Sequence, residues 1–599
     1  MHIKLKPLWS YRHIAIFLLL LTACFFSFYK NSFRIVKNNY LFYQTPSYDE
    51  MLVIGRILVD EYNLKKIITV YNLDKIDKHN TNRYVGKEGA TKYNLLWPDV
   101  PYHLRLSYIF QLPQNILQNN QPIDDITLSP IAYETKWWKK PNIIFNNIFK
   151  LSDDKIYLTR IKVKKDKLNF KQHYQYRNQP SETAYRHDYS YSGRTLLIGN
   201  YKTMVRQVLY SPASDLAYIH TTIPPDELQK IKKNNSTITL SGNVMEKEIL
   251  QNNVRFASYI STVGLHGYIF SWLFQHSDKN LETLWKITSL LSALVIVGLT
   301  FLYYRSHIFP KGFAISFFAS LFLSVIFTAY ARDLYWLPFT WFLPSIFAIL
   351  YIKAENHWHR IIYILLTYLA FTLKNITTGY EITSSVILMA AAPAAYLLLT
   401  SQSLNQKIIA LKKFFMICFL GVAGFFTSLL ILAYIRGDSN IIDGLKSIYD
   451  VNITKRIINK SDENIPGYIR DSSISYYEVF KIFFRWNHDW GYPQTLNIID
   501  WLPIKFVHLF FLSFFITLSS WVVPFLQHKK YIYNSLFIIF FLTASSYIIL
   551  AKYDAYLHIF QNLVLWYFGF IAAMFYIIAS GMMTYGKIIL AYGKKKIAV

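Results

Sequence analysis

The sequence contains repeated apolar stretches of about 20 residues, the length that a helix needs to cross the hydrocarbon core of a bilayer. Apolar and aromatic residues make up 53% of the 599 positions. Charged residues make up only 17%, against about 25% in soluble proteins. These features exclude an ordinary soluble domain and predict a protein that crosses a membrane many times.

We predict ten transmembrane helices from the apolar stretches: 13–29, 284–304, 313–330, 334–352, 361–373, 380–400, 414–435, 503–526, 531–550 and 563–585. The fifth has about 13 residues and would be only roughly 20 Å long. We therefore expect a broken or re-entrant helix there, supported by protein neighbours. It is included as a span mainly because the orientation of the later helices requires an even number.

Lys and Arg are distributed unevenly among the connecting segments. If the N-terminus is cytoplasmic, the inner segments contain 16 Lys and Arg residues and one acid, Glu355. Short loops with such an excess stay on the cytoplasmic side of a membrane. We therefore expect both termini inside the cell, and every other acidic residue outside or at the outer boundary. Any carboxylate chemistry is then extracytoplasmic.

The chain has 63 Lys and Arg residues against 36 Asp and Glu, a net charge of +27. A basic protein can neutralise nucleic-acid phosphates, but this excess is divided among short loops at membrane boundaries, where topology and anionic lipid explain it. We expect membrane lipid as a partner and no nucleic acid. The two cysteines, Cys24 and Cys418, lie inside apolar stretches, so a disulfide framework and a cysteine zinc site are both excluded.

The predicted spans divide the chain into five segments. Residues 1–64 contain the cytoplasmic N-terminus, the first span and an acidic interfacial helix; 65–255 form an extracytoplasmic lobe; 256–435 contain a second interfacial helix and spans two to seven; 436–502 form an outer loop; and 503–599 contain the last three spans and a basic cytoplasmic tail. Strand-like alternation at 155–163, 216–222 and 237–241 predicts a mixed α/β lobe. The expected fold is an all-α membrane protein with this lobe inserted after the first span.

The acidic segment after the first span is the first candidate for chemistry. Tyr48, Asp49 and Glu50 open an amphipathic stretch that continues to residue 64. Ser47 and Glu50 have the spacing of a capping box, and acids at a helix N-terminus are favoured by its dipole. Capping does not require Asp49, and carboxylates close to lipid usually serve a function. A chemical role and a solvated acid both stay open for Asp49.

Arg332 and Asp333 lie at the predicted outer junction of the third and fourth spans. A guanidinium at that depth can donate two parallel hydrogen bonds to a lipid-linked phosphate. It can equally pair with its neighbour, or extend toward water beside aromatic residues. The sequence does not decide between these interpretations.

Lys374, Tyr380 and Glu381 mark the next outer junction, before a helix rich in small residues. Small residues allow close helix packing, so Glu381 is expected to face protein, and a structural pair of Lys374 with Glu381 is one interpretation. The other is contact with substrate.

Two further candidates contain histidine. In the outer loop, Trp486, His488 and Asp489 combine ring faces with titratable groups, which suits contact with a sugar but also suits interfacial anchoring. His266 lies between Gly264 and Gly267 in an uncharged segment, either as a packed histidine or as a substrate contact. Nucleotide-binding loops and a His-Glu-x-x-His zinc motif are absent from the sequence. No cofactor is indicated, although a divalent metal stays open.

This layout resembles the GT-C superfamily of integral membrane glycosyltransferases. The resemblance depends on the basic N-terminus, the single span, and the acidic Tyr48, Asp49 and Glu50 that lead into an amphipathic helix. Two more segments resemble poorly characterised bacterial multi-pass proteins of the same group: 330–344, and the residues Tyr259, Ser261, Val263, Gly264, Leu265, His266, Gly267 and Phe270. The resemblance covers the membrane part only, and the long lobe between the interfacial helices departs from the compact first loop of simpler members.

The resemblance implies an enzyme of the bacterial cytoplasmic membrane that moves a sugar from a polyprenyl phosphate to a glycan, lipid or protein hydroxyl outside the cell. A lipid phosphate is a good leaving group, so one carboxylate base and one cation suffice. We expect Asp49 as the base, Glu50 as the residue that orients either Asp49 or the sugar, and Arg332 with Lys374 as phosphate ligands. Tyr48, His266, Asp333, Tyr380, Glu381, Trp486, His488 and Asp489 are the expected substrate contacts.

Three other functions stay open at this point. A lipid-linked glycan polymerase or ligase shares the outer site but uses an oligosaccharide pyrophosphate as donor. A transporter or flippase is expected to scatter its ionisable groups and to place broken helices at the midplane. A receptor role would use the outer lobe as a binding module.

Overall fold

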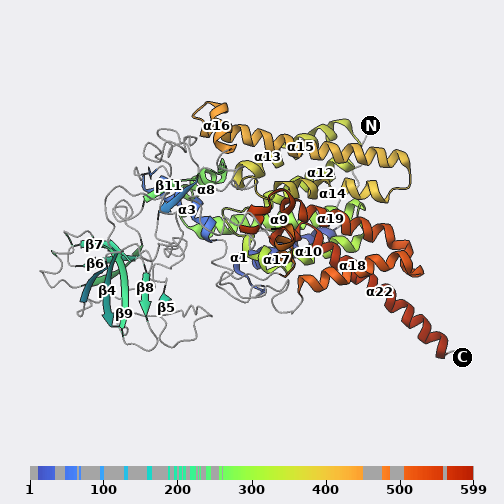
Figure 1. The fold of residues 1–599 in the computed structure, drawn as a ribbon, viewed down its shortest axis with the longest axis horizontal. Helices are drawn as coiled ribbons and strands as arrows, with labels where there is room; N and C mark the ends of the chain where they lie inside the picture. The colour runs from blue at the N-terminus through green and yellow to red at the C-terminus, as the bar shows by residue number, and fades with distance from the viewer. Residues whose placement is uncertain are drawn as a thin grey trace.

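The computed structural model describes residues 11–33, 35, 47–63, 67–68, 95–99, 127–131, 158–164, 186–188, 194–198, 201–205, 207–210, 216–223, 227, 230, 238–244, 255–259, 261–449, 475–485, 505–557 and 563–597. Within these ranges the chain is mostly helical, as expected for a helical membrane protein. The described strands lie beyond one end of the helical body, and α3, α8 and β11 lie between the two (Figure 1).

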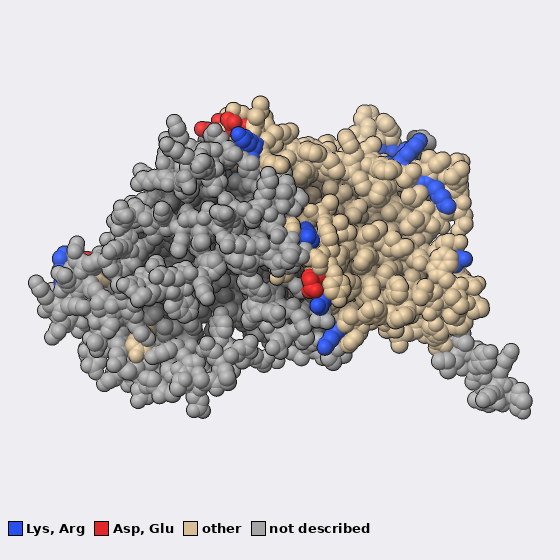
Figure 2. Space-filling model, in the orientation of Figure 1, with Lys and Arg blue, Asp and Glu red and all other residues tan. Residues whose placement is uncertain are grey.

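Six helical segments are long and apolar enough to cross a membrane: α1 (Tyr11–Lys30), α9 (Leu281–Ser306), α13 (His357–Thr378), α14 (Thr383–Thr400), α15 (Leu404–Arg436), and the 3-10 helix η7 (Pro524–Lys529) continued by α19 (Lys530–Leu550). Three shorter helices are also apolar: α10 (Lys311–Phe322), α12 (Pro338–Lys353) and α18 (Phe506–Val522). The last long helix is α22 (Phe570–Ile597). On the face shown in Figure 2, charged side chains near the two ends of the helical body are separated by an uncharged band, as expected of a surface in contact with lipid.

The remaining helices lie at the ends of these long ones. They are α3 (Ser47–Tyr62), α8 (Leu265–Gln275), α11 (Val325–Tyr330), α16 (Ile441–Ile448), α17 (Tyr476–Arg485), α20 (Lys552–Leu557) and the 3-10 helix η8 (Leu563–Tyr567). α3 begins at Ser47, where the capping-box pattern predicts a helix start. It packs on α8, where Ser271 Oγ donates to Asp60 Oδ2 at 2.6 Å. The second interfacial helix, expected at the start of the segment 256–435, begins only at Leu265 as α8, because Arg255–Ser258 form a strand.

The described strands form three sheets. The strands are β1 (Ile67–Ile68), β2 (Leu96–Asp99), β3 (Thr127–Ile131), β4 (Leu158–Lys164), β5 (Arg186–Asp188), β6 (Arg194–Ile198), β7 (Tyr201–Met204), β8 (Gln207–Tyr210), β9 (Leu216–Thr222), β10 (Ile238–Val244) and β11 (Arg255–Ser258). Their orders are β3-β4-β9-β8-β5, β10-β6-β7 and β1-β11-β2, and only the β1–β11 pairing is parallel. β4, β9 and β10 are found where the alternating pattern predicts strands.

The predicted short fifth span is wrong. α13 has 22 residues and is roughly 33 Å long, enough to cross a hydrocarbon core. α13 begins before residue 361, the predicted start, because the Asn356 side chain accepts from Trp358 N at 2.9 Å and caps the helix. It continues beyond residue 373, the predicted end, because the polar residues Lys374 and Asn375 are buried in protein. A prediction from hydropathy alone therefore underestimates the length of a helix whose polar residues face protein.

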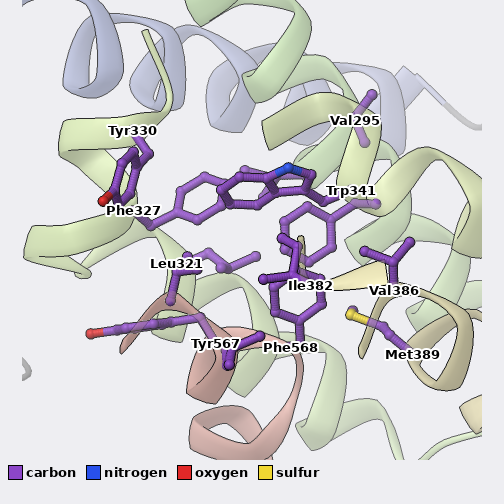
Figure 3. Close-up of a cluster of buried hydrophobic side chains, with 14 of the residues drawn as sticks. Val295, Leu321, Phe327, Tyr330, Trp341, Ile382, Val386, Met389, Tyr567 and Phe568 are labelled. Atoms are coloured by element: carbon purple, nitrogen blue, oxygen red, sulfur yellow. The ribbon is translucent and has the colours of Figure 1, made fainter. Parts of the chain in front are cut away.

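The interruption lies instead in the third predicted span, which the sequence analysis treats as continuous from 313 to 330. α10 ends at Phe322 and α11 begins at Val325. Ser324 lies between them, and its Oγ accepts from Phe327 N at 2.9 Å and caps α11. A cluster of buried side chains surrounds this part of the chain (Figure 3) and includes Tyr330 and Trp341, with ring centroids 6.3 Å apart. This packing holds the residues that follow α11 in a defined position.

Contacts between helices show which of their ends lie together. α1 and α9 run antiparallel, because Phe17 packs on Phe301 with ring centroids 5.3 Å apart while Tyr29 contacts Glu282. The starts of α3, α8 and α9 therefore lie with the end of α1. The basic residue Lys311 lies with the other end, since it follows α9.

α15 approaches α13 closely at Gly424. A Cβ added there would lie 2.9 Å from Phe371 Cβ and 3.0 Å from the Thr372 backbone nitrogen. We expect Gly424→Ala to lower the unfolding free energy by about 1–3 kcal/mol, because the backbone of α13 must move away. Thermal unfolding in detergent measures this change.

Gly586→Ala is the matched control, because no atom lies within 4 Å of a Cβ added at Gly586 on α22. Its midpoint should equal or exceed that of the parent, since alanine is the better helix former and meets no neighbour there. Equal midpoints for both variants would contradict the close approach of α13 and α15.

Candidate functional site

The turn after α11 is built around Asp333, whose side chain is fully buried. Its Oδ1 accepts from Tyr335 N at 2.7 Å and from Trp336 N at 2.8 Å. Two hydroxyls of α9 hold the same turn: Thr288 Oγ1 donates to the Arg332 carbonyl at 2.7 Å, and Ser292 Oγ donates to the Ala331 carbonyl at 2.9 Å. Asp333 therefore shapes the backbone that presents Arg332.

Arg332 lies on the indole of Trp285, with its Cζ 4.5 Å from the ring centroid. Arg332 is only 5% exposed, and its Nη1 donates to the Tyr29 carbonyl at 3.5 Å, which connects the turn to the end of α1. The face of the guanidinium is used for the contact with the indole. Its N–H groups lie in the plane of the guanidinium and therefore point along its edge.

Glu50 completes this cluster from the first turn of α3. Its Oε1 accepts from Trp285 Nε1 at 2.7 Å and from Leu334 N at 3.1 Å, and the residue is only 4% exposed. Burial raises the pKa of Glu50 above its ordinary value, and the positive charge of Arg332 and the two hydrogen bonds lower it in part. We call Glu50, Trp285 and Arg332 the outer triad, where outer means the end of the helical body that lies toward the strands (Figure 1). It places a carboxyl group at the N–H edge of a single indole and a cation over the face of the same ring.

Asp49 and Tyr48 directly precede Glu50 in the first turn of α3. Their side chains lie outside the described residues. The position of Glu50 nevertheless places the backbone of Asp49 next to the outer triad. Trp486, His488 and Asp489 also lie outside the described residues, which end at Arg485 in α17.

Lys374 holds the loop between α13 and α14. Its Nζ donates to the Gly379 carbonyl at 2.7 Å, to the Glu381 carbonyl, and to Thr383 Oγ1 at 3.1 Å. All three ammonium protons therefore have protein acceptors. The observed bond to Glu381 goes to its backbone oxygen, which favours a structural role for Lys374.

Tyr380 connects this loop to α15 by a hydrogen bond. Its hydroxyl donates to the Ser428 carbonyl at 3.0 Å, and burial raises the pKa of Tyr380. Gly379 has a φ of +82° and approaches Thr262 so closely that an added Cβ would lie 2.4 Å from Thr262 Cγ2. The loop thus packs against the turn that leads into α8.

His266 lies in the first turn of α8 and is 1% exposed. Its ring centroid is 5.6 Å from that of Tyr335, whose hydroxyl lies 3.5 Å from the Tyr259 hydroxyl. Neither ring nitrogen has a hydrogen-bond partner among the described residues. Burial lowers the pKa of His266 to about 3, so the ring is neutral at physiological pH.

The structure therefore gathers several predicted residues at one end of the helical body. Glu50 and Arg332 both contact Trp285, and Asp333 shapes the turn whose Leu334 N–H binds Glu50. His266 is joined to them through Tyr335, and the Lys374–Glu381 loop is joined to His266 through the Thr262 turn.

Sequence reasoning missed two buried residues at this end. Trp285 is the centre of the outer triad, but aromatic residues are so frequent at membrane boundaries that no signal distinguishes it. Asp554 on α20 is 2% exposed and accepts from the Tyr547 hydroxyl. A signal for Asp554 was present, because it is the one acid in the sequence after Asp500.

Within the part of the chain that the structure describes, His, Cys, Asp and Glu side chains form no group of three or more that could hold a metal ion. In comparisons with known proteins, no family model, curated protein or solved structure matches the chain.

Removing the Glu50 carboxylate should destabilise the outer end. In Glu50→Ala the buried N–H groups of Trp285 and Leu334 lose their acceptor, at about 1–3 kcal/mol each. Glu50→Gln keeps an acceptor oxygen and should retain most of the stability. Thermal unfolding of both variants in detergent measures the difference, and a Gln variant as unstable as the Ala variant would contradict this role of the acceptor oxygen.

His266 should make stability depend on pH. Its pKa falls from an ordinary 6.5 to about 3 in the folded protein, so the unfolded chain binds the proton first as pH falls below 6.5. Folding stability is then lost progressively, by about 2 kcal/mol at pH 5.

His266→Phe keeps the ring contacts and removes this proton. At pH 7.5 it should match the parent protein in thermal stability, and at pH 5 it should be the more stable of the two. An identical loss of stability in both proteins between pH 7.5 and pH 5 would show that His266 does not titrate in this way.

Proposed function

We propose that this protein is a membrane glycosyltransferase that moves a sugar from a polyprenyl phosphate to a hydroxyl of an extracytoplasmic glycan, lipid or protein, with inversion. The observation that carries the proposal is the outer triad, a buried carboxylate and a guanidinium held on one indole beside the acidic start of α3. A carboxylate near an acceptor and a cation near a leaving phosphate are what this transfer needs.

The proposed topology has ten spans, with both termini in the cytoplasm of a bacterial cell. The spans are α1, α9, α10 with α11, α12, α13, α14, α15, α18, α19 and α22. The placement of the outer triad at the end of α1, opposite Lys311, supports this orientation. So does the lysine excess of the segments assigned to the cytoplasm.

In the proposed reaction, Asp49 takes the proton of the acceptor hydroxyl as that oxygen attacks the anomeric carbon. The bond from that carbon to the lipid phosphate breaks, and the phosphate leaves with its electron pair. Glu50 fixes the first turn of α3 and thereby the position of Asp49. Arg332 stabilises the charge that grows on the departing phosphate, through N–H groups at the edge of its guanidinium.

Within this proposal the phosphate contact centres on Arg332. The three acceptors of Lys374 favour the structural interpretation of that residue, in which it shapes the loop beside Tyr380 and Glu381. Six further residues remain proposed contacts of the substrate or of the residues that bind it: Tyr48, His266, Asp333, Trp486, His488 and Asp489.

A transporter or flippase is the alternative of a different class. The interruption between α10 and α11 favours it, because transporters place broken helices at their binding sites. The gathering of Glu50, Arg332 and Asp333 at one end of the helical body favours the transferase. A lipid-linked glycan polymerase or ligase would use the same residues and differs only in its donor.

A transfer assay on purified protein tests the proposal. With a single sugar on a polyprenyl phosphate as donor, Asp49→Asn should lose about 10²–10⁴ in rate because the base is gone. Arg332→Lys keeps the charge but not the planar fork, and should lose about 10²-fold. Asp443→Asn, an acid of α16 outside the outer triad, should keep the parent rate.

Three outcomes would overturn parts of this proposal. Full activity of Asp49→Asn at equal protein level would exclude Asp49 as the base. Transfer only from an oligosaccharide pyrophosphate would identify a polymerase or ligase. Movement of the lipid donor across liposomes without transfer of its sugar would identify a flippase.

A further inference from the structure

A second group of cationic side chains lies at the opposite end of the helical body, where α18, η7, α19 and α22 meet. Lys529, the last residue of η7, donates from Nζ to Ser580 Oγ at 2.9 Å and to Thr584 Oγ1 at 3.0 Å on α22. The Tyr533 hydroxyl also donates to Ser580 Oγ, at 3.0 Å. These hydrogen bonds therefore hold the ammonium group of Lys529 against α22.

A second lysine lies on the same face of α22. Ser580, Thr584 and Lys587 follow the spacing of four and three residues that aligns side chains along one side of a helix. Lys587 is exposed, one turn beyond the hydroxyl that binds Lys529. Two ammonium groups are thus close to each other at the end of α22, where like charges repel.

A third lysine and two aromatic rings flank this pair. Lys530 Nζ lies 5.2 Å from the ring centroid of Trp521 and 5.0 Å from that of Tyr531. Trp521 and Tyr531 are about half exposed, as expected of aromatic residues at the boundary between lipid and water. The lysines therefore lie at the depth of lipid headgroups.

The chain supplies no nearby carboxylate from this region of its sequence. After Asp500 the sequence contains a single acid, Asp554, which is bonded to Tyr547 near the other end of α19. Glu355, the one acid assigned to the cytoplasmic segments, belongs to the connection between α12 and α13. Among the residues that the structure describes, these two acids therefore do not neutralise the lysines, and an external anion can do so.

We infer that Lys529, Lys530 and Lys587 bind the phosphate headgroup of an anionic phospholipid in the cytoplasmic leaflet. The lipid chains lie along α18, whose side chains Phe511, Phe515, Leu518 and Val522 are at least half exposed. The hydroxyls of Ser580 and Thr584 hold Lys529 toward the headgroup, and Trp521 and Tyr531 flank it. Phe525 of η7 packs on Tyr585 with ring centroids 5.1 Å apart, which keeps η7 against α22.

Native mass spectrometry of the full protein tests this site, after exchange into mixtures of phosphatidylglycerol and phosphatidylcholine. The parent protein should retain phosphatidylglycerol preferentially. Lys587→Met should reduce that retention about fivefold, the effect of one lysine at an anionic surface, without loss of thermal stability. Lys529→Met should reduce it at least as much, but it also breaks the contact of η7 with α22.

Lys412→Met is the matched control, because Lys412 is an exposed lysine in the cytoplasmic part of α15. It should leave lipid retention unchanged. Equal retention by the parent and Lys587→Met, or equal loss in Lys412→Met, would overturn the site. Displacement of the lipid by millimolar inorganic phosphate would show a site for soluble anions and would also overturn the assignment to lipid.

Discussion

Two buried N–H groups, from Trp285 and Leu334, donate to one carboxylate oxygen of Glu50, and this contact connects three parts of the chain that are far apart in sequence. α3, α9 and the turn after α11 meet at that oxygen. Loss of the acceptor would leave two buried donors unpaired, and unpaired buried polar groups are costly. The geometry around Arg332 follows from the same contact, because the indole that binds Glu50 also carries the guanidinium.

The two ends of the helical body use polar residues differently. At the outer end, Asp333 and Lys374 bond to backbone atoms and fix the shape of two turns. At the opposite end, Lys529 bonds to hydroxyls of a neighbouring helix and remains beside other cations. A turn shaped by buried charges is rigid, which suits a site that must position a base and a leaving group.

Much of the helical body could be predicted from the sequence, because uninterrupted apolar runs and the start of α3 at Ser47 depend only on neighbouring residues. α13 was predicted too short because Lys374 is a charged residue by composition but is buried against the loop that follows it, where Gly379 and Thr383 accept its hydrogen bonds. The interruption at Ser324 was missed because serine is common inside apolar helices. The role of Trp285 depends on Glu50 and Arg332, which lie 235 and 47 positions away, and no local pattern contains that information.

α15 has 33 residues and is therefore about 50 Å long, whereas the hydrocarbon core of a bilayer is about 30 Å thick. The helix must tilt or extend beyond the bilayer, and Tyr380 of the loop near His266 is bonded to its carbonyl at Ser428. A change in bilayer thickness would alter the angle of α15 and thereby pull on that loop. The lipid composition of the membrane thus has a mechanical route to the outer end of the molecule.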